Sequence, residues 1–563
     1  MHEDILWLIP PYFSVSDFTL NDRASVYPQF TIPYGILSMD SYLKSYSNKK
    51  LETSVIDFNL VLKKYMDNDV LEEETRSEFT LQTLFQGELE SKLPKRKPKI
   101  VGISVLFNSS AVYIQELSRL VKSILPETLV VLGGGMPSAA FKILLKTCVE
   151  VDAVCKGEGE KPMLELVNSK DFKKTLETHP SFITRRGLEY GKVPNFDYVI
   201  DLDEIPMLDY SLIDLADYNA RSIDKVYSYE KNKIEMSIHT SRGCPFSCVF
   251  CSNPALHGKD VRMMSIDRVE NEIRRMRDEF GMNVLLVEDD HFFHDKERAK
   301  EILRRIAKLG IRAEFPNGLA VYAINDEVAD LLSKAGVSAV ALAVESGSDY
   351  VLNKIIKKPL KKKLIKPAVD SLRRAGVKSH VFIVTGLPGE MDEHRLETRE
   401  MLVSTGFDWV HVFCAIPIHG SRLYDICVEN GYITDTQSER FVATTSVIRA
   451  PGVEPEKVAK WAYETNLIVN FLENTNVKDG KFGVAEAYVE NVYKKYPEHA
   501  LAVGMLWLVQ LRQGKVGFDS ELLRKYKELV EADNEWQSFL NLHKSHLPSE
   551  LQDVKLTKML SHR

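Results

Sequence analysis

Short apolar runs alternate with amphipathic stretches through the first 170 residues. Five of these runs predict strands: 5–9, 51–57, 100–106, 129–132 and 152–155. Between them, residues 33–43 and 111–125 place apolar side chains at helical spacing, and the basic run 92–99 predicts a solvated loop. The alternation predicts a doubly wound, Rossmann-like parallel sheet over residues 1–170, with ligands bound at the carboxyl ends of its strands.

A second α/β pattern begins near residue 233, after a segment of mixed charge (171–232) that predicts a linker. Strands are predicted at 234–239, 284–287, 313–315, 339–344, 379–384 and 410–416. Helices are predicted from the N-cap Ser265 to Met276 and at 296–309, 325–335 and 364–375. About six β/α units predict an open, partial (β/α)6 barrel over 233–450, with its chemistry at the carboxyl ends of the strands.

Beyond residue 450 the pattern becomes helical. Residues 458–472, 484–496 and 500–513 are amphipathic, which predicts an α-helical domain over 451–563. One repeat-like unit is too little for a solenoid, because such repeats are stable only when several stack. We therefore expect these helices to cap the barrel mouth.

Composition narrows the class of protein. The 563 residues are 44% hydrophobic and 27% charged, with a formal net charge of −7, which argues against a nucleic-acid-binding scaffold. Neither a signal peptide nor an apolar run long enough to span a membrane is recognisable, so we expect a cytoplasmic protein. Three of the seven cysteines lie within eight residues, a pattern typical of a metal site in a reducing compartment.

Those three cysteines, Cys244, Cys248 and Cys251, have the spacing C-x-x-x-C-x-x-C directly after a predicted strand. Thiolates bind zinc or iron–sulfur clusters, and three of them leave a four-coordinate site one ligand short. From the residues alone, zinc with His239 or His257 as the fourth ligand stays open.

Small residues gather where the strands of the first domain end. Gly102, Ser104, Gly133 to Gly135, Ser138 and Gly157 all lie at or near carboxyl ends of predicted strands. Such residues let a large, flat ligand approach the backbone closely.

The order of these pieces resembles the cobalamin-binding domain of cobalamin-dependent radical S-adenosylmethionine (SAM) enzymes: a strand ending in Pro-Pro, an Ile-Asp strand, Gly-Ile-Ser, Leu-Gly-Gly-Gly and Gly-Glu-Gly-Glu. The resemblance implies that cobalamin is contacted by Pro10, Asp57, Ser104, Asn108, Gly133, Gly134, Gly135, Ser138, Gly157 and Glu158. Asp57 begins Asp-Phe-Asn-Leu instead of the D-x-H-x-x-G motif that places a histidine under cobalt. We therefore expect base-off cobalamin without a histidine lower ligand.

The cysteine spacing, with Phe250 before the last cysteine, is similar to the radical SAM motif. The resemblance implies a 4Fe–4S cluster held by Cys244, Cys248 and Cys251, with SAM chelating the open iron and yielding a 5′-deoxyadenosyl radical. It also implies SAM contacts from Phe250, Glu288, Asp289, Asp290, Glu345, Ser346 and Gly386. His291 is a candidate proton-transfer group, with an ordinary histidine near the site as the alternative. Cys414 is a candidate cavity residue, with a buried structural thiol as the alternative. Asp295 is a candidate helix cap.

The resemblance implies an enzyme that transfers a methyl group from methylcobalamin to an unactivated carbon, consuming two SAM per turnover. A cobalamin-dependent radical SAM cyclase or oxidative ring-forming enzyme is the runner-up, and a non-catalytic cobalamin or metal sensor is a distant alternative. A methylthiotransferase is disfavoured because Cys148 and Cys155 cannot supply a second three-cysteine cluster. Expected partners are a small-molecule, peptide or lipid substrate and an electron donor such as flavodoxin or ferredoxin, without nucleic acid.

Overall fold

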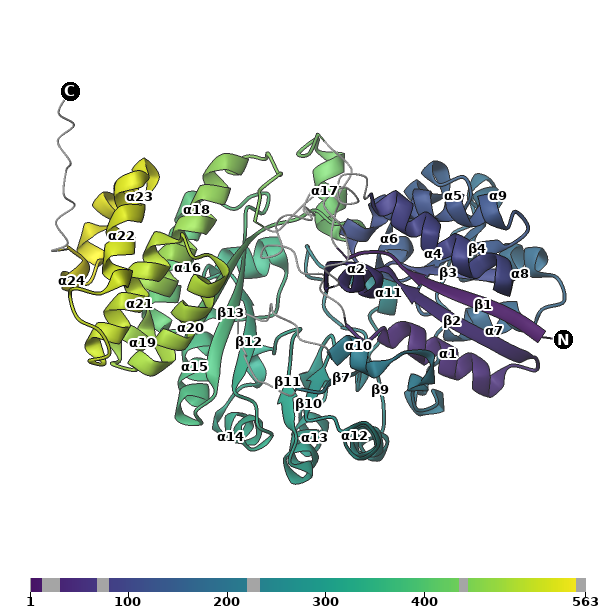
Figure 1. The fold of residues 1–563 in the computed structure, drawn as a ribbon, viewed down its shortest axis with the longest axis horizontal. Helices are drawn as coiled ribbons and strands as arrows, with labels where there is room; N and C mark the ends of the chain where they lie inside the picture. The colour runs from purple at the N-terminus through teal and green to yellow at the C-terminus, as the bar shows by residue number, and fades with distance from the viewer. Residues whose placement is uncertain (1, 13–30, 68–79, 220–232, 435–443, 553–563) are drawn as a thin grey trace.

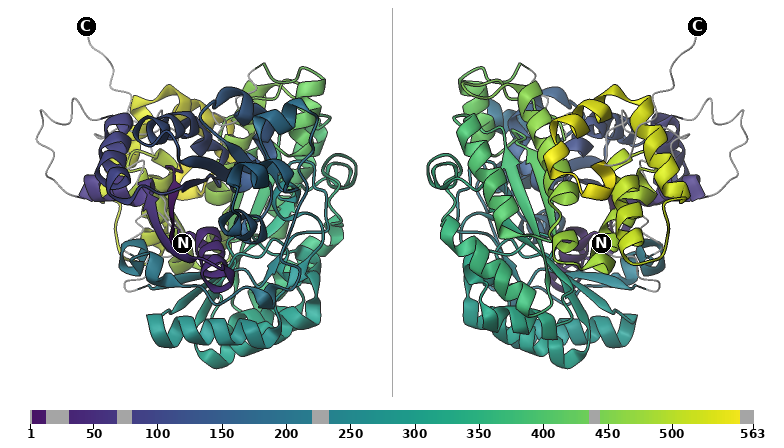
Figure 2. Two further views of the ribbon diagram at one scale, coloured as in Figure 1. Left: turned by 90° about the vertical axis from the view of Figure 1, so that its right-hand side faces the viewer. Right: turned by 90° about the vertical axis from the view of Figure 1, so that its left-hand side faces the viewer.

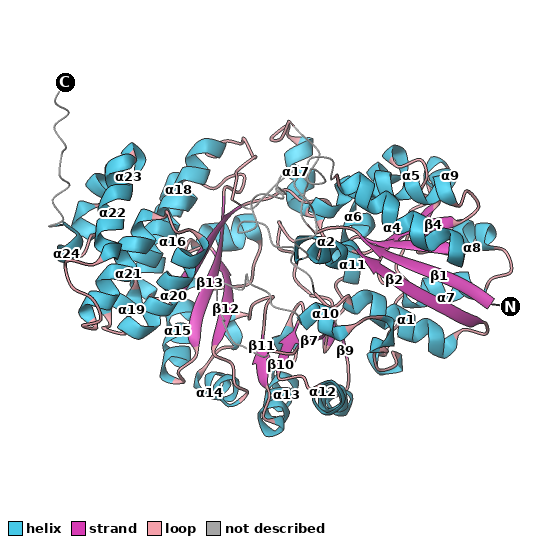
Figure 3. Ribbon diagram, in the orientation of Figure 1, coloured by secondary structure: helices cyan, strands magenta, loops and turns pink. Residues whose placement is uncertain are grey.

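Three units follow one another along the chain in the computed structural model, which describes residues 2–12, 31–67, 80–219, 233–434 and 444–552. In Figure 1 the N-terminal unit lies at the right, the barrel unit at the centre and the C-terminal helices at the left. Figure 3 shows strands only in the first two units. No helix in the described ranges has both the length and the apolar character needed to cross a membrane.

The N-terminal unit is built on a sheet in the order β2-β1-β3-β4-β5-β6. Its strands are β1 (His2–Ile9), β2 (Lys50–Asp57), β3 (Ile100–Ser104), β4 (Leu129–Gly133), β5 (Ala153–Cys155) and β6 (Phe182–Ile183). The first five pair in parallel, which confirms the doubly wound prediction, and β6 joins antiparallel to β5. Because β6 lies beyond residue 170, this sheet extends into the segment expected to be a linker.

Helices cover both faces of this sheet. One face carries α2 (Phe58–Asp67), α4 (Leu81–Arg96), α5 (Ile114–Ile124) and α6 (Gly135–Thr147). The other carries α1 (Tyr34–Tyr46), α7 (Glu160–Asn168) and α8 (Phe172–Thr178). The prediction of a loop at 92–99 was wrong for its first half: α4 continues to Arg96, because Leu89 and Leu93 are fully buried against the sheet.

The segment before the barrel contains short helices: α9 (Arg185–Glu189), η3 (Leu202–Glu204), η4 (Tyr210–Leu212) and α10 (Leu215–Asn219). Leu202 and Ile205 belong to the same apolar core as the barrel strands. The segment is therefore packed against the barrel over much of its length.

Six parallel strands form the barrel, in chain order: β7 (Glu235–Ile238), β10 (Val284–Val287), β11 (Arg312–Glu314), β12 (Ala339–Glu345), β13 (Lys378–Thr385) and β14 (Trp409–Cys414). They form two three-stranded halves, β7-β10-β11 and β12-β13-β14, joined through a single parallel bridge between Leu319 and Leu342. Among the described strands none closes the gap between β7 and β14, which confirms the predicted open barrel.

The barrel helices are α12 (Ile266–Phe280), α13 (Lys296–Leu309), α14 (Asp326–Lys334), α15 (Ile365–Arg374), α16 (Asp392–Thr405) and α17 (Arg422–Glu429). Ser265 caps α12 by accepting from Arg268 N, as predicted. Asp295 caps α13 by accepting from Arg298 N, so this aspartate has the capping role that was the alternative to a role in the site.

The C-terminal helices are α18 (Pro455–Leu467), the π-helical η10 (Ile468–Leu472), α19 (Thr475–Lys478), α20 (Phe482–Lys495), α21 (Ala500–Arg512), α22 (Glu521–Ala532), α23 (Asn534–Leu542) and α24 (Ser549–Gln552). They surround the fully buried Trp507 and pack against β14. Figure 2 shows them in yellow beside the barrel. Side chains of α18 and η10 bond along the backbone of β14, and the expected cap over the barrel mouth stays a prediction.

Candidate functional site

The three cysteines lie on a loop closed at its base by a small ladder. β8 (Ser241–Arg242) pairs antiparallel with β9 (Arg262–Met263), and residues 243–261 between them form what we call the cysteine loop. It begins directly after β7 and contains α11 (Pro254–His257). The loop therefore leaves the barrel at the carboxyl end of its first strand.

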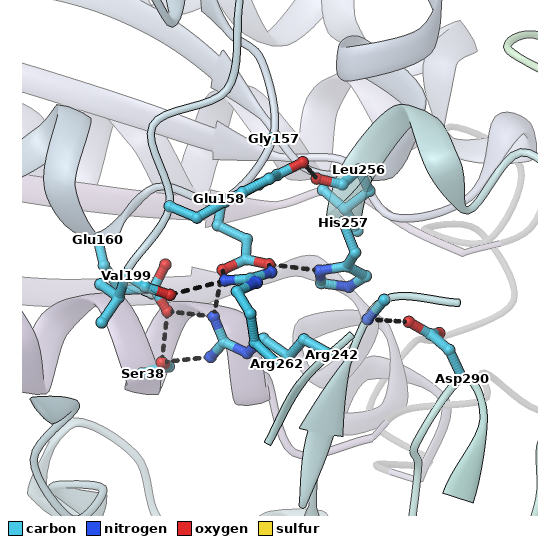
Figure 4. A network of polar contacts seen from close by, with 12 residues as sticks. Ser38, Gly157, Glu158, Glu160, Val199, Arg242, Leu256, His257, Arg262 and Asp290 are labelled. Carbon is cyan, nitrogen blue, oxygen red and sulfur yellow. Dashed lines mark hydrogen bonds and ion pairs between the residues drawn. The ribbon is translucent and has the colours of Figure 1, made fainter. Parts of the chain in front are cut away.

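Two aspartates after β10 hold the entrance of the cysteine loop. Asp289, 3% exposed, accepts from Thr240 N, Thr240 Oγ1 and Ser241 Oγ, each at 2.6 Å. Asp290 accepts from Gly243 N at 2.9 Å (Figure 4). Gly243 has φ +96°, and a Cβ there would lie 2.4 Å from the carbonyl oxygen of Asp260, so this turn requires glycine.

The thiols of Cys244, Cys248 and Cys251 are free and partly exposed. Burial raises the pKa of each, that of Cys251 to about 11. Their sulfur atoms do not all lie within 4.8 Å of one another. Thiolates that share one zinc ion lie about 4 Å apart, because each zinc–sulfur bond is about 2.3 Å. The wider arrangement suits a cluster in which each cysteine binds a different iron.

The two histidines considered as a fourth zinc ligand are engaged elsewhere. His257 Nδ1 lies 2.7 Å from Glu158 Oε1, and His239 Nε2 lies 3.5 Å from Glu288 Oε2. The donor set at the loop is therefore three thiols, with no histidine directed at them from these two positions.

A lysine that the sequence analysis did not single out stands beside the cysteines. Lys358 Nζ donates to Glu345 Oε1 at 2.9 Å, and Glu345 lies at an irregularity in the pairing of β12, with φ +71°. Burial lowers the pKa of Lys358, but Glu345 and the thiols of Cys248 and Cys244 raise it, and the net change is upward. The positive charge of Lys358 therefore acts on two of the three thiols.

His291 faces the loop from the end of β10. Its Nε2 lies 2.6 Å from Tyr322 Oη, and its ring centroid is 5.1 Å from that of Phe246 in the cysteine loop. Burial, His294 and Lys358 lower its pKa to about 4. The imidazole is therefore neutral near pH 7.

Small residues of the N-terminal sheet come together as predicted. We call Gly133, Gly134, Gly135, Ser138 and Gly157 the glycine edge. Ser138 Oγ donates to Gly134 O at 2.8 Å and accepts from Gly157 N at 2.9 Å, which ties the ends of β4 and β5 together. Gly134 has φ +100°, and a Cβ there would lie 2.5 Å from Val105 O.

The glycine edge lies against the cysteine loop. A Cβ on Gly135 would touch Leu256 of α11 at 4.0 Å, and one on Gly157 would lie 3.3 Å from Leu256 O. Gly420, after β14, fits between Ala139 of α6 and Ala255 of α11. The two predicted cofactor regions are therefore neighbours in space.

The comparisons with known proteins agree with this arrangement. Residues 238–402 match the Radical SAM superfamily, and residues 78–167 match the B12 binding domain. The chain thus contains a radical SAM domain and a B12-binding domain. The predicted cofactors, cobalamin, SAM and a 4Fe–4S cluster, fit these two domains.

Relatives extend over most of the chain. A cytidylyl-2-hydroxyethylphosphonate methyltransferase of Streptomyces wedmorensis is 26% identical over 487 residues, 79% of this chain and 88% of that one. An anaerobic magnesium-protoporphyrin IX monomethyl ester cyclase of Rubrivivax gelatinosus is 26% identical over 64% of each chain. The solved structure of TsrM, a radical SAM methyltransferase of Kitasatospora setae with cobalamin and a [4Fe-4S] cluster bound, shares the fold, with a TM-score of 0.57 at 15% identity over 97% of this chain and 99% of that one.

The predicted SAM residues of the radical SAM domain divide into two groups. Phe250, Glu288, Asp290 and Glu345 lie at the loop or at barrel strand ends, with Glu288 accepting from Ser237 Oγ at 2.9 Å. Asp289, Ser346 and Gly386 are packed within the protein, and their SAM contacts stay predictions: Asp289 holds the loop, Ser346 Oγ lies 3.2 Å from Thr398 Oγ1, and a Cβ on Gly386 would lie 2.7 Å from Val458.

Cys414 has the character of a structural thiol. It is buried at the end of β14, and burial, with the charge of Glu390, raises its pKa to about 11. A protonated, enclosed thiol is unreactive, so the structural alternative fits Cys414 better than a catalytic role.

The predicted cobalamin residues of the B12-binding domain are also divided. Ser104 ends β3 and Asn108 begins the 3₁₀ helix η2 (Asn108–Tyr113), both on the side of the glycine edge. Pro10 and Asp57 meet through Asn59, whose Nδ2 donates to both, and Asp57 also accepts from Tyr218 Oη at 3.0 Å. Burial raises the pKa of Asp57 although these bonds lower it.

Glu158, predicted to contact cobalamin, also has partners in the cysteine loop and at its base. Its carboxylate is buried among Arg242, Arg262 and His257 of the cysteine loop and its base (Figure 4). Both oxygens are occupied by these partners, so Glu158 lies between the two domains, and its predicted contact with cobalamin stays a prediction. This pairing could not be predicted from the sequence, because the partners are 84 to 104 residues away along the chain.

Proposed function

We propose that this protein is a cobalamin-dependent radical SAM methyltransferase that places a methyl group on an unactivated carbon. The contact between the cysteine loop and the glycine edge carries the proposal, because it brings the site of radical formation next to the site of the methyl donor. The methyltransferase relative also matches more of both chains than the cyclase relative does, which makes the cyclase alternative weaker.

Each part of the chain then has a chemical task. When bound, the 4Fe–4S cluster and SAM supply a 5′-deoxyadenosyl radical, and cobalamin supplies the methyl group. Cys244, Cys248 and Cys251 would hold the iron, while Asp289 and Asp290 fix the entrance of the loop. The paired ammonium of Lys358 offers a positive charge beside the thiols.

The expected partners follow from this chemistry. The substrate is a small organic molecule, and electrons come from a flavodoxin or ferredoxin of the cytoplasm, since radical formation needs one electron per SAM cleaved. TsrM, which has the same fold, was solved with tryptophan bound, which supports a small-molecule substrate here.

The Cys248→Ala variant tests the cofactor assignment. After anaerobic reconstitution with iron, sulfide, cobalamin and reductant, we expect the variant to lack the visible absorbance of the cluster and to form no 5′-deoxyadenosine from SAM. Cys427→Ala is the control, since Cys427 is buried in α17 and is not part of the cysteine loop. A variant spectrum equal to that of the wild type would refute the ligand assignment.

Methyl transfer is tested separately with SAM that carries a labelled methyl group. Label appearing on a carbon of a cell-extract metabolite, detected by mass spectrometry, is the expected result. Formation of 5′-deoxyadenosine with an unlabelled ring-closed product would favour the cyclase. Wild-type protein that holds cobalamin and a reducible cluster and yet forms no 5′-deoxyadenosine would point to a sensor.

A further inference from the structure

Two arginines face each other across the small ladder at the base of the cysteine loop. Arg242 of β8 pairs directly with Arg262 of β9, and both side chains are buried, with 5% and 7% exposed. Like charges placed opposite each other on a ladder repel. This ladder therefore needs negative charge from outside itself.

Two carboxylates of the B12-binding domain supply that charge. Glu158 Oε2 accepts from Arg242 Nη1 at 2.8 Å and from Arg262 Nη1 at 2.9 Å, and Glu158 Oε1 accepts from Arg262 Nη2. Glu160 Oε1 accepts from Arg242 Nη1 at 2.9 Å and from Ser38 Oγ at 2.6 Å. Two carboxylates thus balance two guanidinium groups inside the protein.

The network holds the cysteine loop on both sides. Arg242 lies two positions before Cys244, and His257, whose Nδ1 is 2.7 Å from Glu158 Oε1, lies six positions after Cys251. Burial alone would raise the pKa of Glu158, but Arg242, Arg262 and His257 lower it well below its usual range. The carboxylate therefore stays charged at neutral pH.

The glycines around Glu158 let the backbone reach this position. Gly157 has φ +84°, and a Cβ there would lie 2.8 Å from Phe196. A Cβ on Gly159 would lie 2.6 Å from Met39 Sδ. The run Gly157-Glu-Gly-Glu160 is thus shaped to bring two carboxylates to the base of the cysteine loop.

We propose that Glu158 is a positioning residue that locks the B12-binding domain to the cysteine loop and so sets the distance between the glycine edge and the three thiols. Its effect on catalysis rests on the proposed function, whereas the lock itself exists in the protein without cofactors. A buried charge pair that loses one partner is strongly destabilised, and the loss is felt where the charges meet.

Hydrogen exchange of the cofactor-free protein tests the lock with Glu158→Gln. We expect amides of residues 157–160 and 240–262 to exchange about tenfold faster or more, with β3, β4 and β12 to β14 unchanged. Glu158→Asp keeps the charge on a shorter side chain and should give a smaller increase in exchange in the same segments. This variant tests the lock if Glu158→Gln does not fold. Glu116→Gln is the control, because Glu116 pairs with Arg119 on the surface of α5.

Two results would overturn the lock. One is unchanged exchange at 240–262 in Glu158→Gln; the other is faster exchange throughout the sheet of the B12-binding domain without a change at 240–262, which would indicate a role in that domain's folding alone.

Assays with all cofactors separate this inference from the proposed function. In Glu158→Gln we expect the share of 5′-deoxyadenosine formed without methyl transfer to rise several-fold above that of wild type. Wild type that cleaves SAM but moves no methyl group would refute the proposed function and leave the exchange result standing. A different result would refute the lock and leave the proposed function standing. In that result the wild type methylates its substrate, and Glu158→Gln has the same share of 5′-deoxyadenosine formed without methyl transfer and the same hydrogen exchange as the wild type.

Discussion

The barrel is joined to its two neighbours by opposite kinds of chemistry. On the side of the B12-binding domain, Glu158 and Glu160 meet Arg242 and Arg262 in a buried network of four charges. On the side of the C-terminal helices, the contacts along β14 are neutral amides and rings. The charged interface lies at the cysteine loop, and the neutral one lies along an edge strand.

The neutral interface completes the backbone of β14. Asn470 Oδ1 accepts from Val410 N and its Nδ2 donates to Val410 O, both at 2.8 Å. Asn466 does the same at Val412, at 3.1 and 3.2 Å. These side chains take the place of a neighbouring strand, and an edge covered in this way cannot pair with another chain.

The difference shows what each interface can specify. Ion pairs in a dry site tolerate little displacement, because a lost partner leaves an uncompensated charge, so they suit a contact that must fix a distance. Amides along a strand satisfy backbone groups that would otherwise lack partners. We infer that the first interface serves geometry at the site and the second serves the stability of the open barrel.

Removing an arginine from the charged interface should have the largest effect. Arg242→Met leaves Glu160 without a guanidinium partner and Glu158 with one, and we expect the unfolding free energy to fall by about 3 to 5 kcal/mol. Urea unfolding of the cofactor-free protein measures the loss, and hydrogen exchange at 240–262 locates it.

Arg422→Met is the matched control, because Arg422 pairs with Glu429 at an exposed site of α17. Such a pair contributes less than about 1 kcal/mol. Equal losses in the two variants would contradict the distinction between a buried lock and a surface ion pair.

The two interfaces also show which features of this protein can be predicted from its sequence and which cannot. Strand and helix periodicity is local, so α13 was predicted with its observed bounds, and the cysteine spacing predicted the place of a metal site. The roles of Glu158 and Asn470 are not local: their partners lie 84 and 60 residues away, and no spacing predicts which distant segments meet.

Distant contacts also distinguish neighbouring residues at the site that look alike in the sequence. Asp289 and Asp290 are adjacent in sequence and were given the same role, yet Asp289 is buried against Thr240 and Ser241, whereas Asp290 bonds only the backbone of Gly243 among the contacts described. Lys358 lies in a lysine-rich run typical of a solvated surface, and only the fold brings it to Glu345.

Truncating an asparagine tests the neutral interface and should have an intermediate effect. Asn470→Ala leaves the N–H and C=O of the buried Val410 without their partners, at a cost of at least about 2 kcal/mol, since each buried unsatisfied group costs at least about 1. Hydrogen exchange should rise along β14 and α18 and stay unchanged at 240–262. Asn430→Ala, at the exposed end of α17, is the control; a loss at Asn470 no larger than this would contradict the edge-sealing role.

The smallest effect is expected from mild acid, which should weaken the neutral interface before the charged one. His380 Nε2 lies 2.7 Å from Tyr488 Oη, beside His411, Asp408 and Lys378, and burial is the main cause that lowers its pKa to about 4. Because the unfolded chain binds this proton near pH 6.5, the stabilisation is complete above that pH and is lost as the pH falls toward 4, with about 2 kcal/mol gone at pH 5.

The stabilising contribution of Glu158 is lost in a more acidic pH range than that of His380. The lowered pKa of Glu158 stabilises the fold above the ordinary glutamate pKa of about 4.3, and that contribution is lost only at more acidic pH. Limited proteolysis at pH 7 and pH 5 should therefore show faster cleavage of the C-terminal helices at pH 5, with residues 240–262 still protected. In His380→Gln the pH dependence should shrink, because the titrating group is gone; an unchanged dependence would assign the acid sensitivity to other groups and remove this distinction between the interfaces.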